Sequence, residues 1–252
     1  MKLKLVEGNP PIGTFLVSGS RAVLEVLADA GFDFVIIDTE HFMLNRETIE
    51  QLVTAAEAAH ITPFVRVPED LSLIAESLDC GALGVIIPRV DTVEQAKKAV
   101  QDARFPPLGN RGVCNPRIVH FGAGGLKAMV QRFKEVDSEI FITAQIESKE
   151  AVDNLSEILA VRGLDSCFIG PFDLSQSLGV PGDIEDERVQ TYIRKALDLG
   201  HKAGKKMGMM AFDPEESQRY IQTGFDYIVY RGDMMILHEA ASKERKEADP
   251  SR

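Results

Sequence analysis

Short apolar runs rich in β-branched residues recur along the chain, and a stretch with helical periodicity follows most of them. This alternation is typical of repeated βα units around a parallel sheet. Eight strands are predicted, at residues 13–17, 33–38, 62–67, 84–88, 141–147, 166–170, 206–211 and 226–230. Helical patterns occupy the intervals, for example at residues 20–31, 45–60, 92–103, 149–161 and 213–224.

A similar phrase closes three of these helices: ADAGFDFV, LDCGALGVI and IQTGFDYIV. The unit of helix, glycine, short loop and strand is therefore repeated. Eight such units in a chain of 252 residues are what a single α/β domain of the (β/α)8 TIM-barrel type requires. We therefore predict one barrel domain over residues 1–252, with an insertion at about 104–140 and a solvated polar tail at about 243–252.

The charge balance narrows the choice of partners. The chain has 39 acidic and 28 basic residues and a net charge of −11, which disfavours a surface for nucleic acid or anionic lipid. Three cysteines without CxxC spacing fit a reducing cytoplasm, and no apolar run approaches the roughly 20 residues of a membrane span. We expect a cytoplasmic protein with a small-molecule partner, no nucleic acid and no membrane contact.

Ionisable side chains follow several of the predicted strands. The stretch FVIIDTEH (34–41) ends in Asp38, Glu40 and His41, and Arg66 lies near the end of the third strand. In a barrel of this type the active site lies at the carboxyl ends of the strands. These residues, QIE (145–147) and GPFD (170–173) should therefore converge on one mouth.

Gln145 and Glu147 stand two residues apart on a strand, so they share one face while Ile146 points the other way. If that face is the barrel interior, two polar groups need partners there. Glu147 and Asp173 suit a divalent ion such as Mg²⁺ or Mn²⁺ held by two carboxylates. The alternative is a salt bridge between this pair and Arg66 without a metal, and spacing alone leaves both open.

His41 taken alone fits a satisfied core histidine better than a catalytic one. Nearby carboxylates at Asp38 and Glu40, with an arginine on the next strand, favour a general base, because a carboxylate can orient the ring and raise its basicity. A Schiff-base mechanism would need a lysine at a strand end. Lys205 and Lys206 instead open the seventh strand, at the opposite end of the barrel.

The ordered set of motifs resembles the HpcH/HpaI family of metal-dependent pyruvate aldolases. The matching segments, over about residues 10 to 240, are FVIIDTEH, PFVRV, LDCGALGVIIPRVDTVEQA, GNRGV, QIES and FIGPFDLSQSLG. The resemblance implies a phosphoenolpyruvate/pyruvate-type barrel that cleaves a 4-hydroxy-2-oxo acid reversibly to pyruvate and an aldehyde. It also implies a divalent metal ion (Mg²⁺, Mn²⁺ or Co²⁺) and a homo-oligomer, often a hexamer that exchanges its last helix.

The resemblance assigns roles at matching positions. Glu147 and Asp173 are the expected metal ligands, and Gln145 with the backbone at Phe172 is expected to hold pyruvate. Arg66 is expected to stabilise the enolate, His41 to transfer protons, and Asp79 to pair with that histidine. Position 172 departs from the family, where alanine is common, and Arg231 is expected either to bind a distal substrate carboxylate or to form a surface salt bridge.

Other functions share parts of this pattern. An acyl-CoA lyase or an oxaloacetate decarboxylase would use the same enolate step, although the acidic sequence offers no clear basic groove for a coenzyme A phosphate. A barrel that has lost catalysis and only binds a ligand is the alternative from another class.

Overall fold

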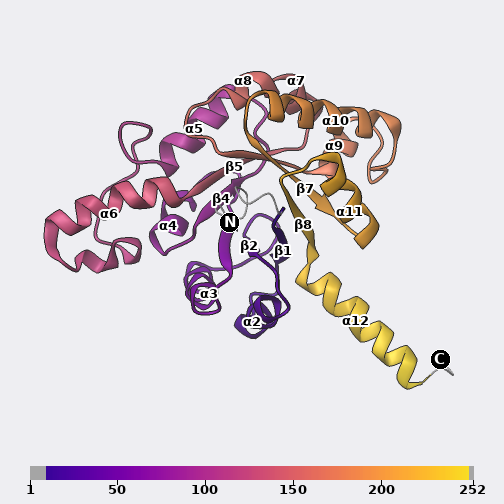
Figure 1. Ribbon diagram of the computed structural model, residues 1–252, viewed down its shortest axis with the longest axis horizontal. Helices are drawn as coiled ribbons and strands as arrows, with labels where there is room; N and C mark the ends of the chain where they lie inside the picture. Colours follow the sequence, from indigo (N-terminus) through magenta and orange to yellow (C-terminus); the bar gives the residue numbers. More distant parts are fainter. Residues whose placement is uncertain (1–9, 250–252) are drawn as a thin grey trace.

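A closed barrel of eight parallel strands forms the centre of the computed structural model, which describes residues 10–249 (Figure 1). Each strand pairs with its neighbours in sequence, and the first pairs with the last, so the predicted TIM-type barrel is confirmed. The strands are β1 (Ile12–Leu16), β2 (Phe34–Asp38), β3 (Thr62–Arg66), β4 (Gly84–Ile87), β5 (Phe141–Ile146), β6 (Ser166–Ile169), β7 (Lys206–Ala211) and β8 (Tyr227–Gly232).

Helices surround the strands, and their apolar faces pack on the outside of the barrel (Figure 1). They are α2 (Arg21–Asp29), α3 (Arg46–Ala58), α4 (Ile74–Asp79), α5 (Val93–Ala103), the 3₁₀ helix η1 (Arg117–Gly122), α6 (Gly125–Glu139), α7 (Lys149–Asp153), α8 (Leu155–Leu159), α9 (Pro171–Ser177), α10 (Glu187–Lys202), α11 (Pro214–Thr223) and α12 (Asp233–Ala248). None of the helices described here is long and apolar enough to cross a membrane.

Local sequence signals set several helix ends. The Asn45 side chain accepts a hydrogen bond from the Thr48 amide at 2.8 Å, and Asp213 caps α11 in the same way with Pro214 at the first helical position. The stretch 149–161, predicted as one helix, is two short helices. They meet at Asn154, whose side-chain amide donates to the Asp91 carbonyl at 2.9 Å.

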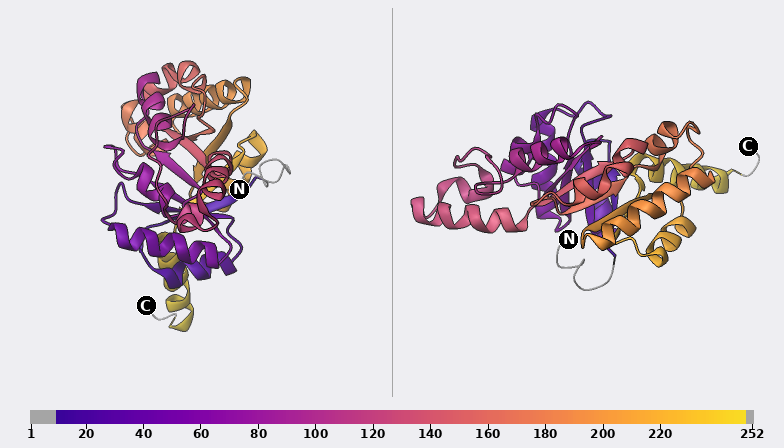
Figure 2. Two further views of the ribbon diagram at one scale, coloured as in Figure 1. Left: turned by 90° about the vertical axis from the view of Figure 1, so that its left-hand side faces the viewer. Right: turned by 90° about the horizontal axis from the view of Figure 1, so that it is seen from above.

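The two departures from the repeat lie at opposite ends of the molecule (Figure 2, right). Residues 104–140 contain η1 and α6, which pack on each other and extend beyond the ring of helices (Figure 1). At the other end, α12 continues to Ala248, so residues 243–248 of the predicted polar tail are an exposed helical segment. Residues 250–252 lie outside the described part of the chain.

Aromatic side chains fill the lower part of the barrel interior, towards the amino ends of the strands. Four rings contact one another edge to face in a closed circle: Phe34 on β2, Phe64 on β3, Phe141 on β5 and Tyr227 on β8. Their centroids lie 5.7–6.5 Å apart, which is the favourable range for such pairs. The Tyr227 hydroxyl is satisfied inside the barrel by the Ser166 hydroxyl at 2.8 Å.

Glycines on the neighbouring strands make room for these rings. A Cβ atom added at Gly84 would lie 2.2 Å from the Phe64 ring, and one at Gly208 would lie 2.1 Å from the Tyr227 ring. Gly13 on β1 faces Phe34 in the same way. The lower barrel is therefore filled by large rings set against glycines rather than by side chains of uniform size.

Candidate active site

A buried ion pair joins the carboxyl ends of β2 and β3, where the strand register sets Asp38 beside Arg66. The Arg66 guanidinium donates from Nε to Asp38 Oδ1 at 2.9 Å and from Nη2 to Asp38 Oδ2 at 2.7 Å. The same guanidinium lies 4.5 Å from the centre of the Phe15 ring. This two-pronged pairing fixes the plane of a positive charge at the mouth of the barrel.

Glu40 connects Arg66 with His41 in the loop after β2. Its Oε2 lies 3.2 Å from Arg66 Nε and 3.7 Å from His41 Nε2. Burial raises the pKa of Glu40, and the positive charge of Arg66 opposes that shift. The His41 side chain is 55% exposed, so its ring is open to substrate and solvent. The structure thus brings His41 and Arg66 to one mouth, as expected, with Glu40 between them and Asp38 committed to the arginine.

Gln145 and Glu147 lie side by side in the barrel interior, and Ile146 packs outward against the helices. The Gln145 amide donates to Glu147 Oε2, and the Arg89 backbone N–H donates to Glu147 Oε1 at 2.8 Å. Within residues 10–249, Gln145 Oε1 is buried without a hydrogen-bond partner. The predicted alternation along β5 is therefore confirmed, and it leaves one acceptor directed into the site.

Burial raises the pKa of Glu147 to about 7, and the nearby negative charges of Asp173 and Glu40 add to the shift. A carboxyl group held in this way gains from a neighbouring cation. Gly170, the residue after β6, permits the arrangement: a Cβ atom there would lie 2.8 Å from Glu147 Oε2 and 3.2 Å from the Gln145 amide nitrogen. The glycine before Pro171 is thus a spatial requirement of the site.

Helix α9 begins directly after this glycine and carries the remaining expected residues. Asp173 is half-buried in its first turn, close enough for its charge to raise the pKa of both Glu147 and Glu40. The backbone N–H of Phe172 belongs to that same turn, where amide groups lack acceptors within the helix. The Phe172 ring is exposed and lies 4.8 Å from the Phe212 ring, centre to centre.

The donor atoms at the mouth suit a hard divalent cation, since Glu147 and Asp173 are carboxylates and Gln145 offers an unpartnered carbonyl oxygen. No group of three or more histidine, cysteine or acidic side chains in the described part of the chain is arranged as a metal cluster. Water and substrate oxygens would have to complete the shell. Arg66 pairs with Asp38 and Glu40, so the alternative salt bridge with Glu147 and Asp173 is not formed.

The structure does not bring Asp79 to this mouth. Asp79 is the last residue of α4, which returns the chain to the start of β4 at the other end of the barrel. Its Oδ1 lies 2.5 Å from Nη2 of the buried Arg111, so the expected pairing with His41 is wrong within this chain. The cause is topological, because only the carboxyl ends of the strands and the loops after them face the mouth.

Two residues of the site were not anticipated. Phe15 supports the Arg66 guanidinium, and its place on the interior face of the strand at 13–17 is a signal that strand alternation contains. Arg89 contributes its backbone N–H from a left-handed conformation with φ +48°. The sequence carries no signal for that contact.

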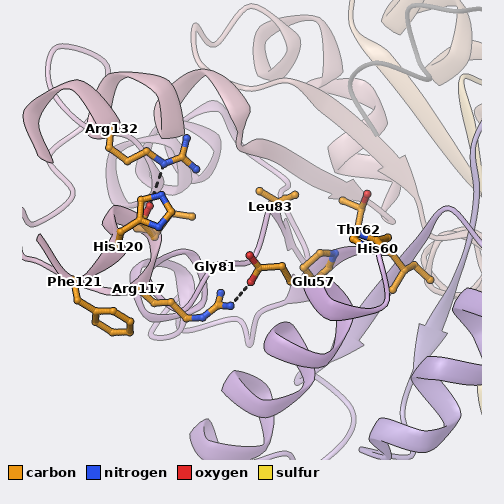
Figure 3. Close-up of a pocket in the computed structure, with 12 residues that line it drawn as sticks. Glu57, His60, Thr62, Gly81, Leu83, Arg117, His120, Phe121 and Arg132 are labelled. Carbon is orange, nitrogen blue, oxygen red and sulfur yellow. Dashed lines mark hydrogen bonds and ion pairs between the residues drawn. The ribbon is translucent and has the colours of Figure 1, made fainter. Parts of the chain in front are cut away.

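A cavity of about 330 Å³ opens at the mouth and is lined by Asp38, His41, Arg66, Gln145 and Asp173 together with apolar side chains. A larger cavity, of about 480 Å³, lies at the other end between α3, η1 and α6 (Figure 3). There Arg117 is paired with Glu57, and Arg132 donates to the Ile118 carbonyl (Figure 3). Of these two cavities, the smaller one is lined by His41, Arg66 and Asp173, which are expected to act together.

Comparisons with known proteins identify the family of the chain. The sequence profile described as HpcH/HpaI aldolase/citrate lyase matches residues 11–238. The chain is 37% identical to a hydroxypyruvate/pyruvate aldolase of Chromohalobacter salexigens, covering 94% of this chain and 92% of that protein. It is 35% identical to a 2-keto-3-deoxy-L-rhamnonate aldolase of Klebsiella pneumoniae, covering 96% and 90%.

Solved structures of related proteins have the same fold. An HpcH/HpaI aldolase from Desulfitobacterium hafniense superposes with a TM-score of 0.92 at 32% identity, covering 98% of this chain and 96% of that one. The citrate synthase SbnG superposes with a TM-score of 0.88 at 30% identity over 100% and 99% of the two chains. The sequence relatives are aldolases, which are carbon–carbon lyases, so the prediction of an enzyme of that class is confirmed. The chain belongs to the HpcH/HpaI aldolase/citrate lyase family.

Proposed function

We propose that this protein catalyses the reversible, metal-dependent aldol cleavage of a 4-hydroxy-2-oxo acid to pyruvate and an aldehyde. The observation that carries the proposal is the fixed guanidinium of Arg66, held by Asp38 at a cavity that also contains His41, Gln145 and Asp173. Cleavage and condensation both pass through a pyruvate enolate. The site therefore needs a cation for the developing oxygen charge and a base for the methyl proton.

Glu147 and Asp173 are the residues that would hold a divalent ion, and a bound ion would supply Lewis-acid polarisation of the 2-oxo group. Gln145 is placed to orient the 2-oxo acid through its side-chain amide: one N–H donates to Glu147, and the second can donate to the keto or carboxylate oxygens of the substrate. The Phe172 N–H adds a donor for the carboxylate. These groups select a small acid that presents several oxygen atoms on one side.

Arg66 stabilises negative charge on the enolate oxygen, since its guanidinium is already oriented and shielded and need not reorganise during reaction. His41 removes or returns the proton. Its ring is accessible, and its Nε2 lies 3.7 Å from Glu40 Oε2. Lys206 is not placed for a Schiff base, because it lies at the first position of β7 and pairs with Asp226 at 2.7 Å.

Proton NMR of pyruvate in D₂O tests the proposal without knowledge of the aldehyde. We expect the methyl signal to disappear when protein and Mg²⁺, Mn²⁺ or Co²⁺ are both present, and to persist after a chelator is added. The His41→Ala variant should lose at least about 100-fold in exchange rate, the usual contribution of a general base. The matched control is His201→Ala, an exposed histidine whose ring contacts the Gly224 carbonyl outside the site.

If pyruvate does not exchange with any of the three metals, the proposal is contradicted. Turnover of an acyl-CoA thioester without pyruvate exchange would favour the lyase alternative, and decarboxylation of oxaloacetate without aldol activity would favour the decarboxylase. Ligand binding without any turnover would leave only the binding barrel.

We also propose that the protein is a homo-oligomer. Helix α12 extends away from the barrel (Figure 1). It exposes Met234, Met235 and Leu237, which supports burial against a second copy. Sedimentation equilibrium of the full chain tests this, and a strictly monomeric protein would contradict it. The hexamer suggested by the family is one of the assemblies that this measurement distinguishes.

A further inference from the structure

The cavity at the mouth has two unlike ends. Around Arg66, Gln145 and Asp173 it is charged and polar, whereas its outer part is lined by apolar side chains from several elements. These are Val17 after β1, Phe42 after β2, Met210 on β7, Phe172 on α9, and Met234 and Met235 on α12. Pyruvate occupies the polar end under the proposed function, so the second reactant must lie against the apolar part.

Neither arginine of this cavity is free to bind a second carboxylate. Arg66 is matched by Asp38 and Glu40. Arg231 has a left-handed backbone with φ +53°, donates from Nε to the Phe212 carbonyl and pairs with Glu239 on α12. Of the two roles considered for Arg231, the structure thus shows the salt bridge. A reactant with a distal acid group would have to displace Glu239.

Aromatic and methionine side chains give the outer part its shape. The Phe172 ring packs on the Phe212 ring and lines one side of the cavity. Met210 is unbranched, so it can adjust to rings or alkyl chains of different outline. Met234 and Met235 belong to the face of α12 proposed above to meet a second copy, so the selection is assigned to Met210 and Phe42. A sugar-derived aldehyde would place its hydroxyl groups among these side chains, where few protein atoms can accept or donate hydrogen bonds.

We infer that the aldehyde partner is an uncharged apolar aldehyde, aromatic or alkyl, and that Met210 and Phe42 help to select it. This inference rests on the proposed function and specifies its second substrate. In the condensation direction, the pyruvate methyl carbon loses a proton and forms a bond to the aldehyde carbon. The aldehyde oxygen gains a proton, giving a 4-hydroxy-2-oxo acid with an apolar substituent at C4 and no change in oxidation state.

The experiment compares aldehydes after deuterium exchange has shown which metal supports enolisation. Initial rates of aldol formation from pyruvate are measured with benzaldehyde, hexanal, glyceraldehyde and succinic semialdehyde, using the full chain. We expect kcat/KM for benzaldehyde and hexanal to exceed that for the other two by about tenfold or more, as an apolar pocket discriminates. Met210→Gln, which preserves length but adds an amide, should reduce that ratio several-fold, by roughly the loss of one apolar contact.

Met43→Gln is the matched control, because Met43 is fully exposed in the loop after β2 and is not part of the cavity lining. Its ratio of rates should equal that of the unmodified protein. If pyruvate exchanges normally but glyceraldehyde or succinic semialdehyde is preferred, this inference is overturned and the proposed function stands. If none of the metals supports pyruvate exchange, the proposed function fails, and the inference fails with it.

Discussion

The two ends of the barrel interior are filled by opposite means. At the amino end of the strands, four aromatic rings from β2, β3, β5 and β8 contact one another and leave little for water or ligand to reach. At the carboxyl end, Asp38, Arg66, Gln145 and Glu147 are equally buried but carry charge and hydrogen-bonding groups. Burial is therefore similar at both ends, and only the chemistry of the side chains separates them.

This difference indicates that the two ends serve stability and function separately. The aromatic end gains from removal of apolar surface from water. The polar end sets a carboxyl group, Glu147, in surroundings that raise its pKa to about 7. Such a group opposes folding in the absence of a partner, so we attribute its place in the barrel to the proposed metal binding rather than to packing. Substitutions at the two ends can test that division.

The largest expected effect on stability is at Phe64, which contacts both Phe34 and Phe141. Phe64→Ala should lower the free energy of unfolding by about 3–5 kcal/mol, because it leaves a cavity in the middle of the barrel. Urea denaturation measures the loss, and Phe121→Ala, which truncates an exposed ring, is the control. If folded Phe64→Ala protein also fails to exchange pyruvate protons, the two ends are not separate.

Glu147→Gln should have the opposite effect to Phe64→Ala, because activity should fall while stability is kept. We expect pyruvate exchange to fall by about 100-fold or more, since a neutral amide holds a divalent cation poorly. The free energy of unfolding without metal should not fall, because the variant no longer buries a carboxylate that folding must protonate or desolvate. Denaturation and NMR exchange are compared with Glu157→Gln, an exposed glutamate on α8. Exchange at the unmodified rate would contradict the assignment of Glu147.

Gly84→Ala tests the close contact between glycine and ring. An added methyl group would meet both the Phe64 ring and the Phe141 carbonyl, so we expect a loss of about 1–3 kcal/mol from overpacking. The control is Gly112→Ala, where a Cβ atom would meet nothing within 4 Å. Equal stabilities for the two variants, measured by thermal unfolding, would show that the barrel adjusts freely.

The smallest effect is expected at the Tyr227 hydroxyl. Tyr227→Phe keeps the ring contacts with Phe34 and Phe141 and removes only the hydrogen bond to Ser166. We expect a loss of about 1 kcal/mol in the free energy of unfolding and no change in pyruvate exchange. A loss several times larger, measured by urea denaturation, would mean that the aromatic end also depends on buried polar contacts.

Periodicity in the sequence was sufficient to predict most of the fold. Strand and helix patterns are local, so the eight strands and most of the helices between them could be predicted from neighbouring residues. The break at Asn154 could not, because it depends on a contact with Asp91, more than sixty residues away in the chain. The four-ring circle likewise depends on register between distant strands.

In the candidate site, too, local patterns predicted some residues, whereas contacts between distant residues could not be predicted. Alternation predicted that Gln145 and Glu147 share the interior, and the barrel rule predicted that His41, Arg66 and Asp173 meet at one mouth. The expected pairing of Asp79 with His41 is not formed within this chain, since the carboxyl end of α4 faces the opposite side of the barrel and Asp79 meets Arg111 there. The backbone donor at Arg89 is a matter of loop conformation, which no local pattern encodes.

The contacts between aromatic rings and glycines in the lower barrel also limit which substitutions can accumulate during evolution. The space occupied by Phe64 is the space that a side chain at position 84 would need, and Tyr227 stands in the same relation to Gly208. A change at one member of such a pair is tolerated only when the other changes in compensation. Homologous chains with a larger residue at position 84 should therefore have a smaller one at position 64, so that bulk moves between neighbouring strands while the total volume is kept.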